Sequence, residues 1–302
     1  MENHETLKAR LRAAGIAYKE QEPLAAHTTF KIGGPAAVFV QPAGEAQLCR
    51  AAALCRELAV PCYLLGNGSN ILFGDKGYAG AVISLAGMKG EARREGDTLT
   101  APAGMPLNAL CMAALHAGLT GLEFAYGIPG TVGGAVYMNA GAYGGEMKDV
   151  LLSVRYLTAE GQIEEAPAAE LDLGYRHSVF ESNGGCILSA AVRLAPGNPE
   201  AIAARMDDLM GRRRDKQPLD KPSAGSTFKR PVGAFAGALI EQCGLRGYRH
   251  GGAAISEKHC GFVVNLGGAT CADVLALCSE VQQIVKEQTG FVLEKEIRVV
   301  EL

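Results

Sequence analysis

Three segments of this sequence place potentially reactive side chains beside charged neighbours. Ser226 follows a glycine and precedes two cations, Arg176 stands in the run Tyr-Arg-His-Ser, and Glu296 lies two residues before an arginine. The planar guanidinium of an arginine suits a substrate carboxylate. A nucleophilic serine would need a base and an oxyanion hole, and the elbow motif G-x-S-x-G is absent. A proton-donating serine is therefore the better interpretation.

The same segments also have structural interpretations, which the residues alone leave open. Residues 224–231 could form an ordinary loop with a Ser-Thr turn. Alternation along residues 291–300 predicts a terminal strand with Glu294, Glu296 and Arg298 on one face, and a solvated edge is the usual reason for such a face. We interpret His177 as structural, because no second histidine or acid lies at ligand spacing.

Residues 127–146 read GIPGTVGGAVYMNAGAYGGE and contain seven glycines. We expect this segment to present backbone amides rather than to pack, because glycine lets a ligand approach the main chain and successive amides form concave anion sites. The fingerprints G-x-G-x-x-G and G-x-x-x-x-G-K-[ST] are absent, which disfavours a Rossmann domain and a P-loop NTPase. The segment is a candidate pyrophosphate cradle.

A second loop of similar character, Gly-Asn-Gly-Ser-Asn at 66–70, lies between short apolar runs at 61–65 and 71–73. A strand, a small polar loop and another strand can direct main-chain amides at a ligand. A plain turn is the alternative, since Asn-Gly and Gly-Ser are common in turns. The presence of two such loops, together with TTFKIGGP at 28–35, favours ligand binding.

Helices and strands alternate irregularly along the chain, which predicts an α+β or mixed fold rather than a parallel βαβ series. A mixed-charge helix is expected within residues 1–20, and further helices at 45–59, 106–117, 199–213, 234–243 and 271–289. Strands are expected at 81–85, 98–101, 152–157, 162–166 and 186–194. A strand-rich part gives way to a helix-rich part near residues 195–199, where we place a domain boundary.

The composition is that of an ordinary globular protein, with 302 residues, 48% hydrophobic, 20% charged and a net charge of −3. It indicates no nucleic-acid partner, and no apolar run reaches the ~18 residues of a membrane span. Residues 1–20 do not resemble a signal peptide, so we expect a cytoplasmic protein. Nine cysteines form no C-x-x-C pair, so we expect buried reduced thiols and no metal site.

These segments together resemble the UDP-N-acetylenolpyruvoylglucosamine reductase family, the flavin enzymes known as MurB. The resemblance covers nearly the whole chain, through TTFKIGGPA at 28–36, LLGNGSNILF at 64–73, GIPGTVGGAVYMNAGAYGGE at 127–146, GYRHSVF at 174–180, AGSTFKRP at 224–231, GGAAISEKHCGFVVN at 251–265 and LEKEIRVV at 293–300. The GSTFKRP form and the short spacer between Arg176 and Ser226 are similar to the shorter, type II form of the family.

The resemblance implies a fold like that of the vanillyl-alcohol-oxidase/PCMH flavoproteins. Residues 1–196 would be the FAD-binding region, with subdomains at about 1–80 and 81–196, and 197–302 a C-terminal α+β substrate-binding domain whose last strand returns Glu296 to the active site. FAD would bind non-covalently. Its expected contacts are Lys31, Gly33, Gly34, Gly66, Asn67, Gly68, Ser69, Asn70, Gly127, Ile128, Pro129, Gly130, Thr131, Gly133, Gly134, Asn139, Gly141 and Ala142.

The resemblance also implies an activity, the NADPH-dependent reduction of UDP-N-acetylglucosamine enolpyruvate to UDP-N-acetylmuramate in peptidoglycan precursor synthesis, hence cell wall biogenesis. Arg176 would neutralise the substrate carboxylate, Glu296 would hydrogen-bond the enolic oxygens, and Ser226 would donate a proton to the adjacent carbon. Contacts to the substrate phosphates or sugar would come from Lys216, Lys229 and Arg230. Arg230 departs from the asparagine of the longer family type.

Two other functions remain as alternatives. An FAD-dependent oxidase or dehydrogenase of a small hydroxy acid could share the fold. Such an enzyme removes hydride from its substrate, so it needs a base and does not need a serine that donates a proton. A non-enzymatic flavin- or nucleotide-binding module would leave Arg176, Ser226 and Glu296 without a role. Fold alone does not decide among these functions.

Overall fold

The computed structural model describes residues 2–88 and 90–301, which form two compact units. Unit 1 holds the chain up to Lys19 together with Val38–Asn67 and Gly80–Arg213. Unit 2 holds Glu20–Ala37, Gly68–Ala79 and the chain from Arg214 onward. One boundary between the units falls between Ala79 and Gly80, at the expected limit of about 80, whereas the expected limit at 196 lies inside unit 1. Unit 2 draws on three separate stretches of the sequence, and the proposed functional domains stay predictions.

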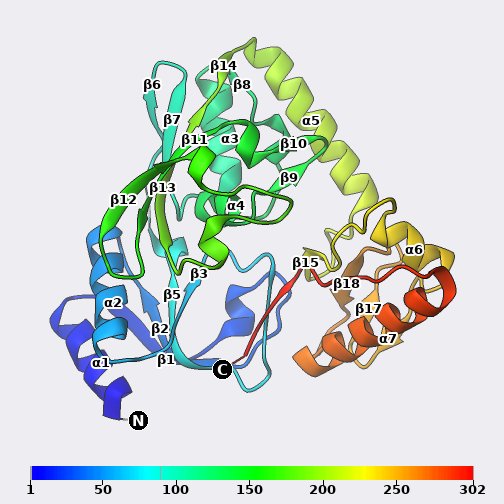
Figure 1. Cartoon of the computed structure of the whole chain (residues 1–302), viewed down its shortest axis with the longest axis horizontal. Helices are drawn as coiled ribbons and strands as arrows, with labels where there is room; N and C mark the ends of the chain where they lie inside the picture. The colour runs from blue at the N-terminus through cyan, green and yellow to red at the C-terminus, as the bar shows by residue number, and fades with distance from the viewer. Residues whose placement is uncertain (1, 89, 302) are drawn as a thin grey trace. The chain divides into compact units, whose positions relative to one another are not determined.

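Unit 1 is built on a five-stranded antiparallel sheet (Figure 1). Its strands, in spatial order, are β12 (Ile163–Pro167), β11 (Leu151–Leu157), β13 (Cys186–Arg193), β7 (Thr98–Pro102) and β6 (Arg93–Glu95). On β13, Cys186, Leu188 and Ala190 are buried along one face, as expected where one face of a strand lies on a core. The predicted strands at 98–101, 152–157, 162–166 and 186–194 are confirmed to within about two residues at each end.

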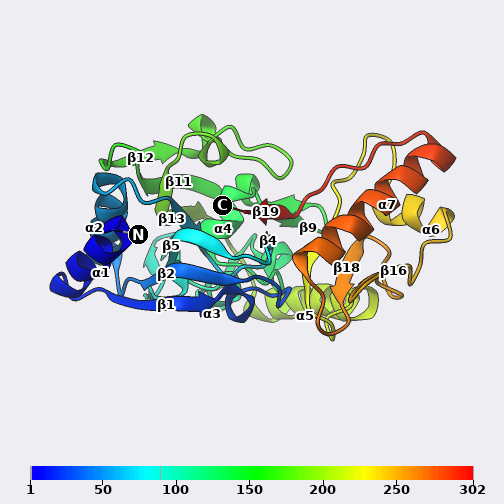
Figure 2. The same cartoon turned by 90° about the horizontal axis from the view of Figure 1, so that it is seen from below.

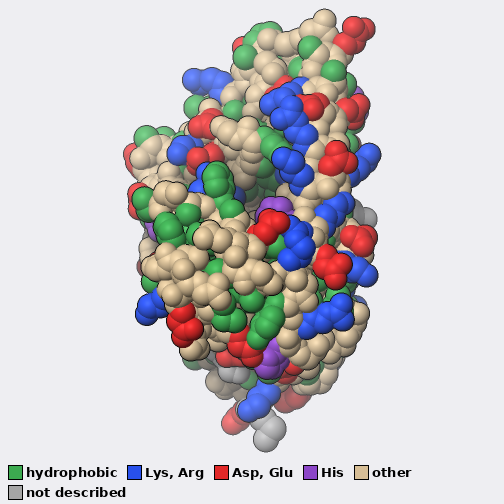
Figure 3. Space-filling view, turned by 90° about the vertical axis from the view of Figure 1, so that its right-hand side faces the viewer, with side chains coloured by type: hydrophobic (Ala, Val, Ile, Leu, Met, Phe, Trp, Pro, Cys, Tyr) green, Lys and Arg blue, Asp and Glu red, His purple; other side chains and the backbone are tan. Residues whose placement is uncertain are grey.

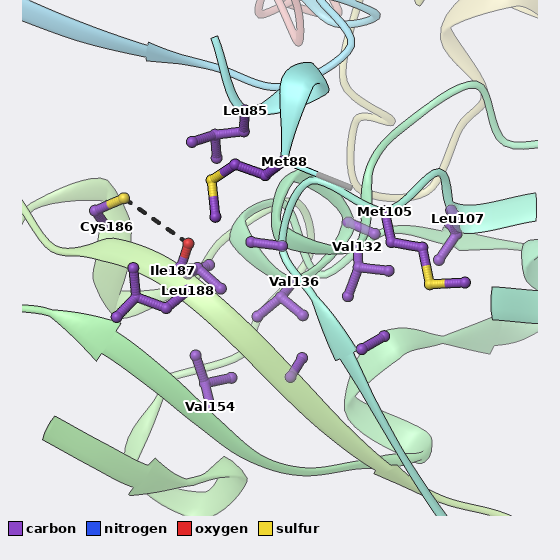
Figure 4. Close-up of a cluster of buried hydrophobic side chains, with 14 of the residues drawn as sticks. Leu85, Met88, Met105, Leu107, Val132, Val136, Val154, Cys186, Ile187 and Leu188 are labelled. Atoms are coloured by element: carbon purple, nitrogen blue, oxygen red, sulfur yellow. Dashed lines mark hydrogen bonds between the residues drawn. The ribbon is translucent and has the colours of Figure 1, made fainter. Parts of the chain in front are cut away.

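Two helices, α3 (Leu107–His116) and α4 (Val132–Tyr137), belong to the core of unit 1. Figure 4 shows Val132 and Val136 of α4 in one cluster with Met105, which lies just before α3, and with Leu188 of β13. The helix α4 lies inside the glycine-rich segment 127–146, so the expectation that this segment contains no packing element was wrong. Its small residues allow a close approach: a Cβ on Gly133 would lie 2.8 Å from the Cβ of Ala103.

The first two helices of unit 1, α1 (Glu2–Ala13) and α2 (Glu45–Glu57), pack on each other and are seen side by side in Figure 2. A four-stranded sheet follows the order β1 (Ala17–Pro23), β2 (Pro35–Gln41), β5 (Tyr78–Ser84) and β3 (Cys62–Leu65), with β3 parallel to β5. The chain passes from one unit to the other within β1, β2 and β5.

Unit 2 contains a second antiparallel sheet, covered by the helix α7 (Cys271–Thr289) (Figure 2). Its strands are β15 (Ser223–Ser226), β18 (Phe262–Asn265), β17 (Ala253–Ile255) and β16 (Arg249–His250). Thr270 and Asp273 form a capping box at the start of α7, and Gly290 ends it with a left-handed φ of 77°. A shorter helix, α6 (Ala236–Gln242), packs against α7.

A two-stranded parallel sheet in unit 2 joins β4 (Ile71–Phe73) to β19 (Arg298–Val300). Only these last residues of the expected strand 291–300 are in a strand, and the simple alternation is not observed. Leu293 and Ile297 are buried on the expected apolar face, but Lys295 between them is exposed. Residues 294–296 pair with residues 227–229 rather than with β4. The part of the chain after residue 196 holds the helices α5 (Pro199–Lys216), α6 and α7 together with the strands β15–β19.

The remaining elements are short except for the helix α5, which has 18 residues. They are β8 (Leu119–Thr120) paired with β14 (Ala195–Pro196), β9 (Gly141–Ala142) paired with β10 (Gly145–Glu146), the helix α5 (Pro199–Lys216), and the 3₁₀ turns η1 (Leu24–His27), η2 (Leu85–Gly87), η3 (Glu123–Ala125), η4 (Met147–Asp149), η5 (Ala168–Glu170) and η6 (Val179–Glu181). The predicted helices at 45–59, 106–117, 199–213, 234–243 and 271–289 correspond to α2, α3, α5, α6 and α7.

All nine cysteines are free, and six of them are buried. Burial raises the pKa of Cys186 to about 12, so this thiol stays protonated at neutral pH. Within residues 2–88 and 90–301, no helix is both long and apolar enough to cross a membrane. Figure 3 shows basic and acidic side chains together on the face that it presents.

Candidate active site

Ser226 ends the strand β15, directly after a break in its pairing with β18. Ser223 pairs with Val264 and Ser226 with Phe262, so the register shifts between them, and Gly225 has a left-handed φ of 75° at this bulge. A bulge redirects the following side chain and is common beside active sites. The glycine before the serine, which suggested only a loop in the sequence, is therefore the residue that permits the bulge.

Glu296 lies next to this bulge through main-chain hydrogen bonds. Its amide donates to the carbonyl oxygen of Thr227 (2.8 Å), and the amide of Lys229 donates to the carbonyl oxygen of Glu294 (2.8 Å). Thr227 is buried, and its hydroxyl accepts a hydrogen bond from the amide of Val263 (2.9 Å). The structure thus brings the backbone of Glu296 opposite the residue that follows Ser226. The role of Thr227 was missed in the sequence, where nothing distinguishes it from the threonine of an ordinary Ser-Thr turn.

Asn70 holds the main chain on the C-terminal side of Glu296. Its side-chain amide donates to the carbonyl oxygen of Glu296 (3.2 Å), and its own carbonyl oxygen accepts from the amide of Arg298 (3.0 Å). The loop that was expected to bind a cofactor is therefore attached to the segment that carries Glu296.

Segment 28–35 supports the same loop in unit 2. The amide of Thr29 donates to the carbonyl oxygen of Gly68 (3.1 Å), and a Cβ on Gly68 would lie 2.3 Å from the carbonyl oxygen of His27. A Cβ on Gly34 would similarly lie 2.3 Å from the carbonyl oxygen of Asp75. Glycine is thus required at both positions by contacts within the protein, whether or not a cofactor approaches them.

Unit 1 contributes the other glycine-rich loop. The side chain of Asn67 donates to the carbonyl oxygen of Pro129 (2.8 Å), and a Cβ on Gly66 would lie 2.8 Å from the hydroxyl of Thr131. The two candidate cradle loops, 66–67 and 129–131, are therefore neighbours in unit 1. Gly134 is exposed beside them, and a Cβ there would meet nothing closer than 3.4 Å. Exposed backbone with little side chain around it fits a bulky anionic ligand such as the FAD pyrophosphate.

Arg176 lies in unit 1, at the tip of a tight turn. Gly174 and His177 exchange both backbone hydrogen bonds (3.1 and 3.3 Å), and Arg176 has a left-handed φ of 57°. Its guanidinium donates to the carbonyl oxygen of Gly141 (3.2 Å) and lies 5.0 Å from the ring centroid of Tyr175. The guanidinium is only partly buried, as a group that receives a substrate carboxylate should be.

His177 contacts two acids, Glu181 at 2.5 Å and Asp172 at 3.1 Å. These hydrogen bonds raise the pKa of the imidazole. The short helical turn of residues 179–181 brings Glu181 to the ring, a contact that the sequence analysis did not identify. These two contacts agree with the interpretation of His177 as a structural residue. Among the described residues, no cluster of His, Cys, Asp or Glu is arranged to hold a metal ion.

The three candidate substrate contacts Lys216, Lys229 and Arg230 all belong to unit 2. Lys229 lies 3.5 Å from the carboxylate of Glu294, in a solvent-exposed pair that contributes little to stability. The guanidinium of Arg230 lies over the ring of Phe235, 4.5 Å from its centroid. Phe235, which the sequence did not single out, thus orients one of the expected cations.

The comparisons with known proteins bear on the whole chain. The protein named UDP-N-acetylenolpyruvoylglucosamine reductase from Lachnoclostridium phytofermentans is 50% identical over 92% of this chain and 91% of its own length. The protein of the same name from Clostridioides difficile is 48% identical over 93% and 92%. The chain belongs to the UDP-N-acetylenolpyruvoylglucosamine reductase family. The family's C-terminal domain matches residues 217–300, and the family described as "FAD binding domain" matches residues 36–166.

Solved structures agree with this assignment. The reductase of Thermus caldophilus superposes with a TM-score of 0.79 and 36% identity, over 95% of this chain and 99% of that chain. A BBE-like protein of Physcomitrella patens shares only the fold, with a TM-score of 0.50 and 20% identity over 62% of this chain and 44% of that chain. The α+β class and the FAD-binding fold predicted from the sequence are confirmed, and the individual site residues stay predictions.

Proposed function

We propose that this chain reduces UDP-N-acetylglucosamine enolpyruvate to UDP-N-acetylmuramate at the expense of NADPH, as a step in cytoplasmic synthesis of peptidoglycan precursors. The chain is an FAD-dependent oxidoreductase by its family and its FAD-binding domain. The observation that carries the proposal is the identity of 46–50% to proteins named as reductases, over 92–95% of this chain.

The glycine-rich loops support a role in holding FAD. In unit 1 the loops 66–67 and 129–131 are neighbours, Asn67 and Pro129 in them are exposed, and so is Gly134 just beyond. Residues 68–70, which continue the first loop, belong to unit 2 and include the buried Gly68. When bound, FAD supplies the hydride, taken from NADPH, that adds to the methylene carbon of the enolpyruvyl group. The residues of the chain then have to handle the charge and the proton that accompany this addition.

Arg176 is proposed to neutralise the substrate carboxylate as negative charge accumulates on it. The turn at 174–177 holds its guanidinium at a defined place, and fixed charges of this kind are often the largest catalytic contribution. Glu296 is proposed to hydrogen-bond the enolic oxygens, sharing one proton with them. Its main chain is held from both sides, by Thr227 and Asn70, which limits its movement.

Ser226 is proposed to donate the proton that completes the reduction. Hydride at the methylene carbon and a proton from Oγ at the adjacent carbon together add one H₂ equivalent across the double bond, and solvent reprotonates the serine. Positioned proton transfer of this kind contributes roughly two to four orders of magnitude in rate. The bulge at Gly225 gives the serine an orientation that a regular strand would not. Lys216, Lys229 and Arg230 are proposed to contact the nucleotide phosphates or the sugar.

The experiment that tests the proposal uses the purified protein reconstituted with FAD. Anaerobic NADPH should bleach the flavin absorbance, and the enolpyruvyl sugar nucleotide should restore it with formation of UDP-N-acetylmuramate. Re-oxidation by a small hydroxy acid's keto product, without a response to the enolpyruvyl substrate, would instead support the alternative oxidase. A protein whose flavin NADPH does not bleach would contradict the proposed reaction.

A further inference from the structure

The turn that carries Arg176 is attached to the end of the glycine-rich segment at several points in unit 1. The hydroxyl of Ser178 donates to the carbonyl oxygen of Tyr137 (2.7 Å), and the guanidinium of Arg176 donates to the carbonyl oxygen of Gly141 (3.2 Å). Between these two attachments lies Asn139, which is fully buried and has a left-handed φ of 38°. Asparagine tolerates this backbone conformation better than most residues.

Both amide protons of Asn139 are used within the protein. One is donated to the carboxylate of Glu146 (2.7 Å) and the other to the carbonyl oxygen of Gly174 (2.9 Å), while the side-chain oxygen accepts from the amide of Lys148 (2.9 Å). The carboxylate accepts hydrogen bonds only, so it fixes the orientation of the amide: a flipped side chain would direct its oxygen at Glu146. The buried amide is therefore locked toward Gly174.

We propose that Asn139 is a positioning residue for Arg176, oriented by Glu146, and that its side chain does not bind the cofactor. Gly174 is the first residue of the turn, and its carbonyl oxygen also accepts the amide of His177 (3.3 Å), so the hydrogen bond from Asn139 fixes the base of the turn. This revises, for the side chain alone, our expectation that Asn139 contacts FAD, because both amide protons are already donated within the protein. A backbone contact from Asn139 remains compatible with the geometry.

The inference rests on the proposed role of Arg176. Arg176 is one of the two residues at the tip of the turn, so its guanidinium moves with the backbone of that turn. A misplacement of about 1 Å can lower the rate of a reaction on the order of 100-fold. The hydrogen bonds through Asn139 link the turn to residues 141–146, which form the hairpin of β9 and β10. The network thus determines where the guanidinium lies without touching the substrate.

The decisive variant is Asn139→Asp. It is nearly isosteric and keeps the acceptor for Lys148, but it places a second carboxylate beside Glu146 and removes the donor to Gly174. We expect re-oxidation of the reduced flavin by the enolpyruvyl substrate to slow by about 10- to 100-fold, while FAD content and the rate of reduction by NADPH change less than about twofold. Hydrogen exchange at the amides of Gly174 and His177 should become faster. Asn183→Asp is the control, since the side chain of Asn183 accepts from the amide of Gly185 (2.8 Å) and aspartate can do the same.

Two variants of Glu146 test the same inference if Asn139→Asp does not fold. Glu146→Ala removes the group that orients Asn139, whereas Glu146→Gln keeps an oxygen that accepts from it, and the side chain of Glu146 is 33% exposed. We expect Glu146→Ala to slow the same half-reaction and Glu146→Gln to retain most of the rate. Equal rates in these two variants, or loss of FAD with an unchanged turn in Asn139→Asp, would overturn the inference.

Arg176→Ala, measured in parallel, separates this inference from the proposed function. If Arg176→Ala leaves re-oxidation by the substrate intact, the proposed role of Arg176 is wrong. If Arg176→Ala abolishes re-oxidation but Asn139→Asp neither slows it nor speeds exchange at the turn, the proposed function stands and the positioning role of Asn139 is wrong.

Discussion

The amide of Glu296 donates to the carbonyl oxygen of Thr227 over 2.8 Å, so the residue after Ser226 holds the main chain of Glu296. Thr227 is in turn fixed by the hydrogen bond that its amide donates to the carbonyl oxygen of Gly261 (2.8 Å) and by the one that its hydroxyl accepts from the amide of Val263. One buried threonine therefore sets the relative position of the two backbone segments that carry the proposed proton donor and carboxylate. The predictions that follow separate these residues from their structural surroundings.

Ser226→Ala should leave flavin reduction by NADPH nearly intact and slow the oxidative half-reaction by roughly two to four orders of magnitude, because the hydroxyl acts only on the second substrate. Stopped-flow absorbance of the two half-reactions measures both rates. Ser223→Ala is a matched control on the same strand, since Ser223 contributes its carbonyl oxygen to the hydrogen bond from Thr29. Equal slowing of both half-reactions in Ser226→Ala would remove the serine from this role.

Glu296→Gln should keep the fold and the flavin but depress turnover with the enolpyruvyl substrate sharply. Glu294→Gln should be nearly neutral, within about 0.5 kcal/mol in the free energy of unfolding, because Glu294 is exposed and pairs only loosely with Lys229. Steady-state rates and denaturant unfolding of the two variants give the comparison. Similar activity in both would exclude Glu296 from the catalytic set.

Gly134→Ala tests the cradle without disturbing the fold. The added Cβ would meet no atom closer than 3.4 Å, and alanine favours a helix by about 1 kcal/mol over glycine, so stability should be kept or raised. If FAD lies against this backbone, the ratio of flavin to protein absorbance should fall. Gly68→Val is a poorer test, because the clash with His27 would disturb unit 2 whether or not FAD binds there. Full flavin content in Gly134→Ala would place the cofactor elsewhere.

The pairing of His177 with Glu181 and Asp172 predicts a pH-dependent stability. Because the pKa of His177 is raised in the folded protein, its contribution is fully present below the unfolded value of about 6.5 and is lost as pH rises through the folded value. His177→Gln should therefore reduce the free energy of unfolding more at pH 6 than at pH 9. Urea unfolding at the two pH values measures the difference, and an equal effect at both would contradict the ion pairs.

Asp75 should stabilise unit 2 through the first turn of α7. Its two carboxylate oxygens accept from the amides of Cys271 (2.7 Å) and Ala272 (3.0 Å). Loss of such a capping carboxylate costs about 1 kcal/mol, so Asp75→Ala should lower the free energy of unfolding by about that amount. Lys76→Ala, one residue away and exposed, is the control. Thermal and urea unfolding monitored by circular dichroism would reveal the difference.

The sequence predicted most elements of unit 1 because their patterns are local. The strands of the five-stranded sheet have β-type composition with turn residues between them, and α2 and α3 have recognisable ends. The helix α4 was missed because its glycines, read alone, favour loops, whereas Gly133 is needed for close contact with Ala103. That contact joins residues distant in sequence, so no local signal reveals it.

The site was predicted at the level of motifs rather than of contacts. Ser226, Glu296 and Arg176 were named through a resemblance, but neither the bulge at Gly225 nor the amide of Asn139 could be assigned to a role from the sequence. Both depend on partners far along the chain or on a backbone conformation that the residue type permits without specifying. Gly68 and Gly34 illustrate the converse, since glycines that suggested ligand contact are already required by neighbouring backbone.

Unit 2 is assembled from three stretches of the chain, and its strand β19 pairs with β4 from the second of them. A gene segment that encodes only residues from Arg214 onward would therefore specify a sheet edge without its partner, and Glu296 without the asparagine that holds it. Ser226 and Glu296 therefore cannot be moved into another protein, with their structural support, as one continuous segment of sequence. Recombination that exchanges this region between relatives should succeed only when the short stretches around residues 20–37 and 68–79 come from the same parent.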